Sequence, residues 1–386
     1  MIKENNTKKI VVLHILNKMD RAGAETLIMN IMRKIDKEHF CFKFLLKTKD
    51  HGQFDEEIFE LGGEIYYVDR FNGLNYFSYK KQLLDFFSSH KEIDIVHAHQ
   101  GSSAALDTLF AKESGLLTIA HSHNTYTNNP FDFKEILFKI ISYRTRFTSD
   151  VYIGCSRAAL LSRFGRKIEK RKECYILNNG IEIDKFFFSS EKRKNFRKQH
   201  GIGDKDKIFA FIGRLTKIKN PLFAIDCFEK VLSSQSDSYL LIAGVGPLKN
   251  RIQKTIRKKR LSKKIFLLGN IPNVDELLSA SDFLLMPSLK EGFPVVLVEA
   301  QCSNISCLVS NKITKEVKLS NNIFFLPIKG LKVKNLWVNS ISLELEKERK
   351  RDITNNAIVS EFSDESTIKK IEYIYKKMFD EKYDEE

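Results

Sequence analysis

The 386-residue sequence lacks most of the features that mark secreted or membrane-spanning proteins. Its six cysteines are scattered without C-x-x-C spacing, and most lie inside apolar runs, which favours reduced core thiols over a disulfide framework. The opening residues, M-I-K-E-N-N-T-K-K, do not resemble a signal peptide, and no segment approaches the roughly 18 apolar residues of a membrane span. We therefore expect a soluble protein in the cytoplasm.

Acidic residues are missing from residues 249–264, a strongly basic stretch of a chain whose formal net charge is +15. Further basic clusters occupy residues 163–172 and 192–198. Nucleic acid, an anionic membrane and phosphorylated small molecules are three partners that such charge attracts. Residues 249–264 also lack aromatic side chains for base stacking, so no nucleic acid is expected. Residues 131–147 are amphipathic and basic, which favours peripheral contact with an anionic membrane, while solvated helix faces explain the charge equally well.

Short apolar runs of strand length recur along the chain and alternate with stretches of helical spacing, as in parallel βαβ units. The first series of expected strands comprises residues 10–16, 42–46, 65–68, 93–96, 116–120, 151–153 and 175–177. The second series comprises residues 208–212, 239–243, 265–268, 283–286, 306–309 and 323–326. The predicted fold class is α/β, with two Rossmann-like, doubly wound parallel-sheet domains that face one another across a cleft.

A charged stretch that begins at Asp184 separates the two series and indicates a domain boundary. We expect residues 1–184 to form the first domain and residues 185–361 the second. Residues 362–386 have the pattern of a helix with one apolar stripe. The stripe consists of Ile368, Ile371, Ile374, Tyr375 and Met378.

Two carboxylates follow one strand of the second series. Glu291 lies in the loop after that strand, and Pro294 is expected at the first position of a helix that contains Glu299. Open α/β sheets bind ligands at the carboxyl ends of strands, beside helix N-termini. Two carboxylates there can accept hydrogen bonds from vicinal hydroxyls, which predicts a sugar or a ribose as the ligand.

Cationic residues follow another strand of the same series. Gly213 allows a ligand to approach the backbone, and Arg214 and Lys219 flank the start of the next helix, an arrangement suited to a diphosphate. Surface charge on a basic protein is the alternative explanation for either residue alone.

Three further positions at strand ends are weaker candidates. Gly246 lies in a glycine turn that is either close to a phosphate or simply a tight connection. Asn270 and Ile271 close the next strand, where backbone groups could hold the edge of a base. In the first domain Gly23 lies in a loop of small residues, which is not the dinucleotide fingerprint G-x-G-x-x-G and is equally typical of a tight turn.

Two strands of the first domain end in His-x-His, at His97 and His99 and at His121 and His123. Alternate residues of a strand share a face, so each pair could chelate a metal or line a cleft. No cysteine or carboxylate accompanies the pairs at ligand spacing, so we expect no metal. One histidine of each pair is expected to pack, and the last one to face the cleft. His123 is the better candidate for contact with substrate, where it could hold a sugar hydroxyl or the transferring centre.

The motifs G-A-E-T, H-S-H-N, N-N-G-I-E, G-R-L…K-N-P, G-V-G-P-L and E-G-F-P-V-V-L-V-E-A-Q occur in this order between about residue 10 and residue 309. Together they resemble family-four, GT-B-fold glycosyltransferases, and are most similar to the bacterial capsular polysaccharide and exopolysaccharide biosynthesis members. The resemblance implies a retaining hexosyl- or N-acetylhexosaminyltransferase with a nucleotide-sugar donor, a UDP-sugar, and no metal or other cofactor. It further implies a growing lipid-linked glycan acceptor at the cytoplasmic, inner face of the cell membrane.

The resemblance also implies roles for residues of the second domain. Arg214 and Lys219 would hold the donor diphosphate, Glu299 the ribose hydroxyls and Glu291 the sugar hydroxyls. Fixed cations agree with metal-free departure of a nucleoside diphosphate, because negative charge develops on the leaving oxygen.

Backbone groups and the first domain would complete the site. By the resemblance, Gly292 and Phe293 would offer N–H groups near the sugar. His123 would lie near the transferred sugar, and Gly23 near the phosphate and the acceptor. The last helix would cross back onto the first domain.

The chain departs from the family's pattern at Ala22, Val245, Asn311 and the pair Ser303-Asn304. None of these belongs to the charged set, so activity is expected. A non-catalytic nucleotide-sugar-binding or scaffold subunit of a polysaccharide assembly complex is the alternative. A nucleotide-sugar epimerase is less favoured, because the first domain offers no clear set of acid–base carboxylates. Residues 204–206, Asp-Lys-Asp, lie in the polar linker and are interpreted as a chance match to a metal-binding Asp-x-Asp.

Overall fold

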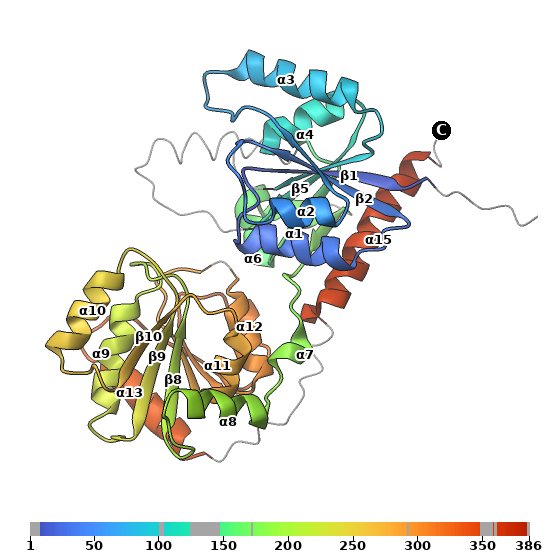
Figure 1. The fold of residues 1–386 in the computed structure, drawn as a ribbon. Coiled ribbons are helices and arrows are strands. Elements are labelled where there is room, and N and C mark those ends of the chain that lie inside the picture. Colours follow the sequence, from blue (N-terminus) through green and yellow to red (C-terminus); the bar gives the residue numbers. More distant parts are fainter. Residues whose placement is uncertain are drawn as a thin grey trace, which may run out of the picture. The chain divides into compact units, whose positions relative to one another are not determined.

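The structure is a computed structural model that describes residues 8–99, 104–123, 147–170, 173–291, 293–347, 358 and 361–383. The chain divides into two units, one formed by Met1–Gly180 with Asp364–Glu386 and the other by Ile181–Ser363 (Figure 1). The boundary thus follows Gly180 rather than residue 184. Ile181 pairs with Ser363 and packs in the core of the second unit, which explains the earlier boundary.

A seven-stranded parallel sheet forms the centre of the first unit, in the order β3-β2-β1-β4-β5-β6-β7. Both faces are covered by helices, so β1 is buried along its whole length, and its sequence is apolar except for His14. The strands are β1 (Ile10–Leu16), β2 (Phe40–Leu46), β3 (Glu64–Tyr67), β4 (Ile95–His99), β5 (Leu117–Ser122), β6 (Val151–Gly154) and β7 (Cys174–Ile176).

The helices of the first unit pack on both faces of this sheet. One face carries α1 (Gly23–Lys34), α2 (Asp55–Glu60) and the C-terminal α15 (Asp364–Tyr383), and the other carries α3 (Tyr76–Ser89) and α4 (Ala104–Glu113). A smaller cluster involves α6 (Arg157–Phe164) and the 3₁₀ helix η2 (Arg166–Lys170).

The C-terminal helix α15 belongs to the first unit although 183 residues of the second unit precede it. Its predicted stripe is confirmed, because Ile368, Ile371, Ile374, Tyr375 and Met378 are all buried in the core that α1, β1 and β2 share. Figure 1 shows α15 beside α1 and β2. The return of the last helix onto the first unit agrees with the expectation from the resemblance.

A six-stranded parallel sheet forms the centre of the second unit, in the order β10-β9-β8-β11-β12-β13. The strands are β8 (Lys207–Ile212), β9 (Ser238–Ala243), β10 (Ile265–Gly269), β11 (Phe283–Met286), β12 (Ser306–Ser310) and β13 (Ile323–Leu326). The helices are α7 (Ile183–Phe186), α8 (Ser190–Gln199), α9 (Pro221–Val231), α10 (Lys249–Lys258), α11 (Val274–Ala280), α12 (Val295–Cys302), α13 (Val333–Leu345) and the 3₁₀ helix η3 (Lys315–Val317).

The predicted fold class, two doubly wound parallel α/β sheets, is confirmed, and every expected strand is present. One local prediction is wrong. Pro294 does not occupy the first helical position but is the N-cap of α12, because its ψ of 103° is extended rather than helical. Its fixed φ still fits the start of the helix.

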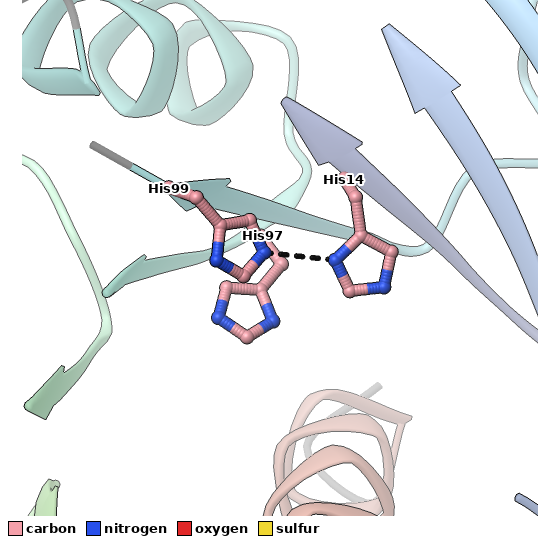
Figure 2. Close-up of side chains that lie close together, drawn as sticks. All are labelled: His14, His97 and His99. Carbon is pink, nitrogen blue, oxygen red and sulfur yellow. Dashed lines mark hydrogen bonds between the residues drawn. The ribbon is translucent and has the colours of Figure 1, made fainter. Parts of the chain in front are cut away.

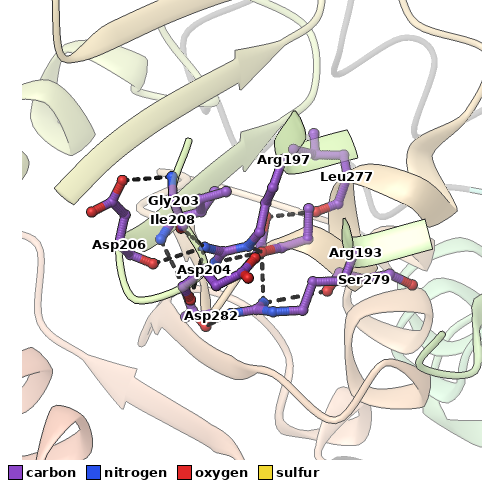
Figure 3. Close-up of polar contacts among 11 residues, drawn as sticks. Arg193, Arg197, Gly203, Asp204, Asp206, Ile208, Leu277, Ser279 and Asp282 are labelled. Atoms are coloured by element: carbon purple, nitrogen blue, oxygen red, sulfur yellow. Dashed lines mark hydrogen bonds and ion pairs between the residues drawn. The ribbon is translucent and has the colours of Figure 1, made fainter. Parts of the chain in front are cut away.

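A buried arginine, Arg197, connects the segments that precede β8 and β11, at the amino-terminal ends of these strands (Figure 3). Arg197 is 1% exposed and donates from Nη1 to the carbonyl oxygens of Gly203 at 2.6 Å and Asp206 at 3.0 Å. Its Nη2 donates to Ala280 O and to the Asp282 carboxylate, each at 3.0 Å. The basic cluster 192–198 therefore includes a structural residue, and residues 204–206 serve here through backbone carbonyls.

Two expectations from the sequence concern the membrane: that no segment spans it, and that the basic segment 131–147 contacts it. No helix among the described residues is both long and apolar enough to cross a membrane. The amphipathic segment 131–147 falls almost wholly outside the described residues. The basic helix α10 uses its apolar side chains, Ile252 and Ile256, in the core of the second unit, and therefore presents charged and polar side chains, but no apolar one, to solvent.

Candidate active site

A pocket of about 220 Å³ opens at the carboxyl ends of β8, β9 and β10 in the second unit. Four residues that the sequence singles out line it together: Gly213, Arg214, Asn270 and Ile271. Crossover connections bring these residues together, since β8, β9 and β10 are neighbours in the sheet. The predicted strand-end position of a ligand site is therefore the position of a pocket.

Glycines allow the loops around this pocket to pack backbone against backbone. Gly213, Gly244 and Gly246 all have positive φ, at 146°, 139° and 156°. A Cβ on Gly244 would lie 2.0 Å from the carbonyl oxygen of Gly213, and one on Gly246 would lie 2.7 Å from that of Leu215. Of the two explanations for Gly246, a tight connection therefore has a direct structural basis.

The loop after β8 and the loop after β11 are joined by one ion pair and two hydrogen bonds. Lys219 Nζ lies 2.7 Å from the Glu291 carboxylate. Asn220, which has the left-handed φ of 57°, donates from its side chain to Pro287 O at 3.2 Å, and Leu289 N donates to Ile218 O at 2.7 Å. Lys219 and Glu291, predicted for different parts of one donor, are thus direct partners.

Arg214 and Glu299 differ from that pair, because neither side chain has a hydrogen-bond or ion-pair partner in the part of the chain that the structure describes. Arg214 is exposed beside the pocket. Glu299, in α12, is partly buried, and the loss of hydration raises the pKa of its carboxyl to about 7. Phe293 stacks its ring on Phe362 at 5.4 Å, and Gly292 lies outside the described residues.

Gly23 in the first unit has a different environment from the glycines of the second. It is the first residue of α1, it is exposed, and a Cβ built on it would meet nothing within 4 Å. Neither packing nor backbone conformation accounts for a glycine here. Glu25, two residues further along α1, is buried, and burial raises the pKa of its carboxyl.

Five histidines, which we call the histidine array, lie on one face of the sheet in the first unit: His14 on β1, His97 and His99 on β4, His121 on β5 and His123 directly after it. The register explains the array, because His14 lies opposite His97 and His99 opposite His121. The rings of His97 and His99 stack, with centroids 4.0 Å apart, and those of His121 and His123 lie 3.9 Å apart and are tilted by 30°.

Two chains of hydrogen bonds cross the array. In the first, His99 Nε2 lies 2.9 Å from His14 Nδ1, and His99 Nδ1 lies 2.9 Å from His123 Nε2. In the second, His97 Nδ1 lies 2.7 Å from the Tyr375 hydroxyl, and His97 Nε2 lies 3.2 Å from His121 Nδ1.

Burial keeps these imidazoles neutral near pH 7. It lowers the pKa of His14 and His123 to about 3, and that of His97, His99 and His121 well below the ordinary value. His123 is the half-buried member, as expected for a residue that faces outward. For the pair His97 and His99, the expectation that the second histidine faces the cleft is wrong. His99 is as buried as His97, at 2% exposure each, because rings from both neighbouring strands enclose it.

His14 was missed as a candidate because it lies inside an apolar strand rather than in a His-x-His motif. A signal was present: in a doubly wound sheet the first strand neighbours the fourth, so a histidine near its carboxyl end falls beside the histidines of β4.

Two doubly wound parallel sheets in one chain, the second with a strand-end pocket that Arg214 lines, define the GT-B class of fold. Residues 192–359 match the family described as Glycosyl transferases group 1. The chain is 31% identical over 314 residues to EpsF of Bacillus subtilis (strain 168), described as a glycosyltransferase, covering 81% of this chain and 82% of that protein. The chain therefore belongs to the group 1 glycosyltransferases, family four with the GT-B fold.

Two further comparisons agree with this assignment. The capsular polysaccharide biosynthesis glycosyltransferase CapH of Staphylococcus aureus is 28% identical over 328 residues, which covers 82% of this chain and 84% of CapH. The crystal structure of Anabaena Alr3699/HepE in complex with UDP and glucose has a TM-score of 0.75 at 16% identity, with 94% of this chain and 98% of that chain covered.

Proposed function

We propose that the protein is a metal-independent, retaining hexosyl- or N-acetylhexosaminyltransferase that moves a sugar from a UDP-sugar to a growing lipid-linked glycan of a surface polysaccharide. The observation that carries this proposal is the pocket of about 220 Å³ at the carboxyl ends of β8, β9 and β10, with Arg214, which has no hydrogen-bond or ion-pair partner among the described residues, at its wall. A fixed cation beside a strand-end pocket suits a diphosphate.

The names of related proteins support the donor and the acceptor. Anabaena HepE was crystallised with UDP-glucose. An Escherichia coli relative, 27% identical over 231 residues and 57% of this chain, is named UDP-Gal:alpha-D-GlcNAc-diphosphoundecaprenol alpha-1,3-galactosyltransferase. We infer a donor and an acceptor of the same classes here, a UDP-sugar and a glycan on a polyprenyl diphosphate.

Arg214 and Lys219 have distinct tasks in this proposal. Arg214 is free to pair with the donor diphosphate and stabilises the charge that develops on the departing UDP. Lys219 is held by Glu291, which orients its ammonium group and leaves two of its three N–H donors for a phosphate. Glu291 in turn accepts hydrogen bonds from hydroxyls of the transferred sugar.

Glu299 and the backbone of the pocket hold the nucleoside. The Glu299 carboxylate, which lacks a partner in the described part of the chain, accepts from the two ribose hydroxyls. Asn270 and Ile271 lie on the pocket wall and offer backbone groups to the base edge. Phe293 and Gly292 supply N–H groups near the sugar.

Two residues of the first unit serve the acceptor and the transferred sugar. Gly23 leaves open space at the start of α1, so a phosphate and the acceptor can approach the backbone there. His123 is neutral and ordered by His99, so it can exchange hydrogen bonds with a sugar hydroxyl.

The experiment that tests this function is a donor panel. Purified protein is incubated with UDP-, GDP- and dTDP-sugars in the presence of membrane extract, and the release of nucleoside diphosphate is measured. We expect UDP release from one or more UDP-sugars that depends on the extract. Binding of a UDP-sugar without turnover of any donor would instead favour the scaffold subunit.

A further inference from the structure

We propose that His14, His97 and His99 bind a divalent transition metal of the zinc class, with the Tyr375 hydroxyl as the fourth ligand, and that this metal fixes α15 on the sheet of the first unit. The site is distinct from the donor pocket, which belongs to the other unit, and has a structural role. Nothing in the transfer reaction proposed above depends on it.

The three imidazoles converge on one point. One ring nitrogen of each lies within 4.8 Å of the other two. Figure 2 shows a nitrogen of His97 and a nitrogen of His99, one ring above the other, both directed toward His14. The ring centroids of His14 lie 5.2 Å from His97 and 5.1 Å from His99. A His-x-His pair on one strand and a histidine on the next strand therefore place three nitrogens around a common centre.

The spacing fits a metal after a small adjustment. Zinc–nitrogen bonds of about 2.0–2.1 Å place the ligand atoms of a tetrahedron roughly 3.3–3.4 Å apart. His14 Nδ1 and His99 Nε2 are 2.9 Å apart, so they must separate by about half an ångström. Imidazole ligands suit zinc, copper, nickel and iron rather than calcium or magnesium, which prefer oxygen.

The remaining nitrogens of two ligands already have the partners that a metal site requires. A histidine that binds metal through one nitrogen usually donates through the other, which fixes the ring. His99 Nδ1 can donate to His123 Nε2 at 2.9 Å, and His97 Nε2 can donate to His121 Nδ1 at 3.2 Å. His121 and His123 then orient the two ligands of β4, which explains why the array extends beyond three rings.

Tyr375 completes the site from a different element. Its hydroxyl lies 2.7 Å from His97 Nδ1, and its side chain is fully buried on α15. Three histidines and a tyrosine leave no open coordination position on a tetrahedral metal, which is typical of structural sites.

A second set, His99, His121 and His123, also meets the spacing of a metal site. His123 is half-buried, whereas His14, His97, His99 and Tyr375 are all buried. The structure therefore favours the first set. His14 belongs only to the first set and His123 only to the second, so variants at these two residues distinguish them.

The test is a direct metal measurement on the full chain. The purified protein is equilibrated with a small excess of ZnCl₂, desalted and analysed by elemental mass spectrometry, and a Co²⁺-loaded sample is examined by visible absorption. We expect one metal per chain, a tetrahedral Co²⁺ spectrum and a higher melting temperature with metal. Both His14→Phe and Tyr375→Phe should lose the cobalt spectrum and the thermal shift, whereas the control His200→Ala, in the second unit, should keep them.

Two results would overturn the proposal. One is a folded wild-type protein that retains no zinc or cobalt, in which case the array is a hydrogen-bonded polar core. The other is loss of the metal in His123→Ala together with its retention in His14→Phe, which would assign it to the other set. Because metal content and cobalt absorption are measured without substrate, failure of the proposed transfer activity would not affect either readout.

Discussion

At the scale of single residues, we predict that Glu299 makes donor binding depend on pH. Burial raises the pKa of its carboxyl to about 7, and the ionised form accepts hydrogen bonds from both ribose hydroxyls more strongly, because its two oxygens share a negative charge and neither carries a proton. We therefore expect the affinity for the productive UDP-sugar to increase between pH 6 and pH 8. Isothermal titration of wild type and Glu299→Gln measures this, and the variant should bind weakly and equally at both pH values. An equal pH profile in the two proteins would remove Glu299 from the donor site.

Stability supplies an independent check on the same carboxyl. Its folded-state pKa of about 7 lies above the ordinary 4.5, so the folded state holds the proton more tightly. The stability that this group contributes is present below pH 4.5 and is lost as the pH rises through 7. Relative to Glu299→Gln, the wild type should therefore lose stability from pH 5 to pH 8 in urea unfolding.

Two glycines form a matched pair that separates packing from ligand binding. A Cβ on Gly244 would lie 2.0 Å from a carbonyl oxygen, whereas a Cβ on Gly23 would meet nothing within 4 Å. We expect Gly244→Ala to lower the melting temperature clearly, and Gly23→Ala to leave it unchanged while it reduces turnover. Thermal unfolding and UDP release measure the two effects. Full activity of a stable Gly23→Ala protein would contradict the role assigned to this loop.

At the scale of elements, Arg197 holds together the segments at the amino-terminal ends of β8 and β11. It connects α8 to the turn before β8 and to the end of α11, where its guanidinium meets the Asp282 carboxylate. We expect Arg197→Met to destabilise the second unit by about 3–5 kcal/mol, because Asp282 and several carbonyls lose a buried donor. Urea unfolding monitored at Trp337, which lies in this unit, measures the loss.

The exposed neighbour Lys198 is the control for that substitution. Lys198→Met changes the same charge on the same helix, and its stability should stay within about 0.5 kcal/mol of the wild type. Equal stabilities of the two variants would show that the network of Figure 3 contributes little.

The elements follow from the sequence more completely than the site does. Strands buried on both faces, such as β1 and β8, appear as short apolar runs between helical segments, so their number and order were predictable. Neighbour relations across the sheet carry no local pattern. For this reason the pairing of Lys219 with Glu291 required the structure, whereas the position of His14 beside the histidines of β4 could be inferred only from the strand order of the fold class. The capping role of Pro294 depends on a backbone ψ that composition does not specify.

At the scale of the whole molecule, the distribution of basic residues predicts how the protein binds to a membrane. The exposed basic residues of α10 form a charged face without an apolar one, because Ile252 and Ile256 are in the core. Binding through such a face is electrostatic, with about 1 kcal/mol per Lys or Arg near an anionic surface. We propose that the protein acts at the inner face of the cell membrane. Flotation with phosphatidylglycerol vesicles should be efficient at low salt and lost near 0.5 M NaCl, where charges are screened.

A double variant tests whether α10 is responsible. Lys254→Glu and Arg257→Glu reverse two exposed charges of this helix and should abolish flotation at low salt. Lys194→Glu with Lys198→Glu, on α8, reverses the same number of exposed charges and should reduce it less. Binding that persists at high salt would rule out the electrostatic account.

The central claim is that the pocket of the second unit binds a UDP-sugar and that Arg214 stabilises the departing diphosphate. Its most direct test is to measure UDP-sugar affinity and turnover in the same preparations of wild type, Arg214→Ala, Glu299→Ala and the control Lys230→Ala, an exposed residue of α9. The account predicts a turnover about 10²–10³-fold lower in Arg214→Ala with a smaller effect on affinity, and an affinity at least about 10-fold weaker in Glu299→Ala. Lys230→Ala should match the wild type. Unchanged affinity and turnover in both site variants would contradict the account.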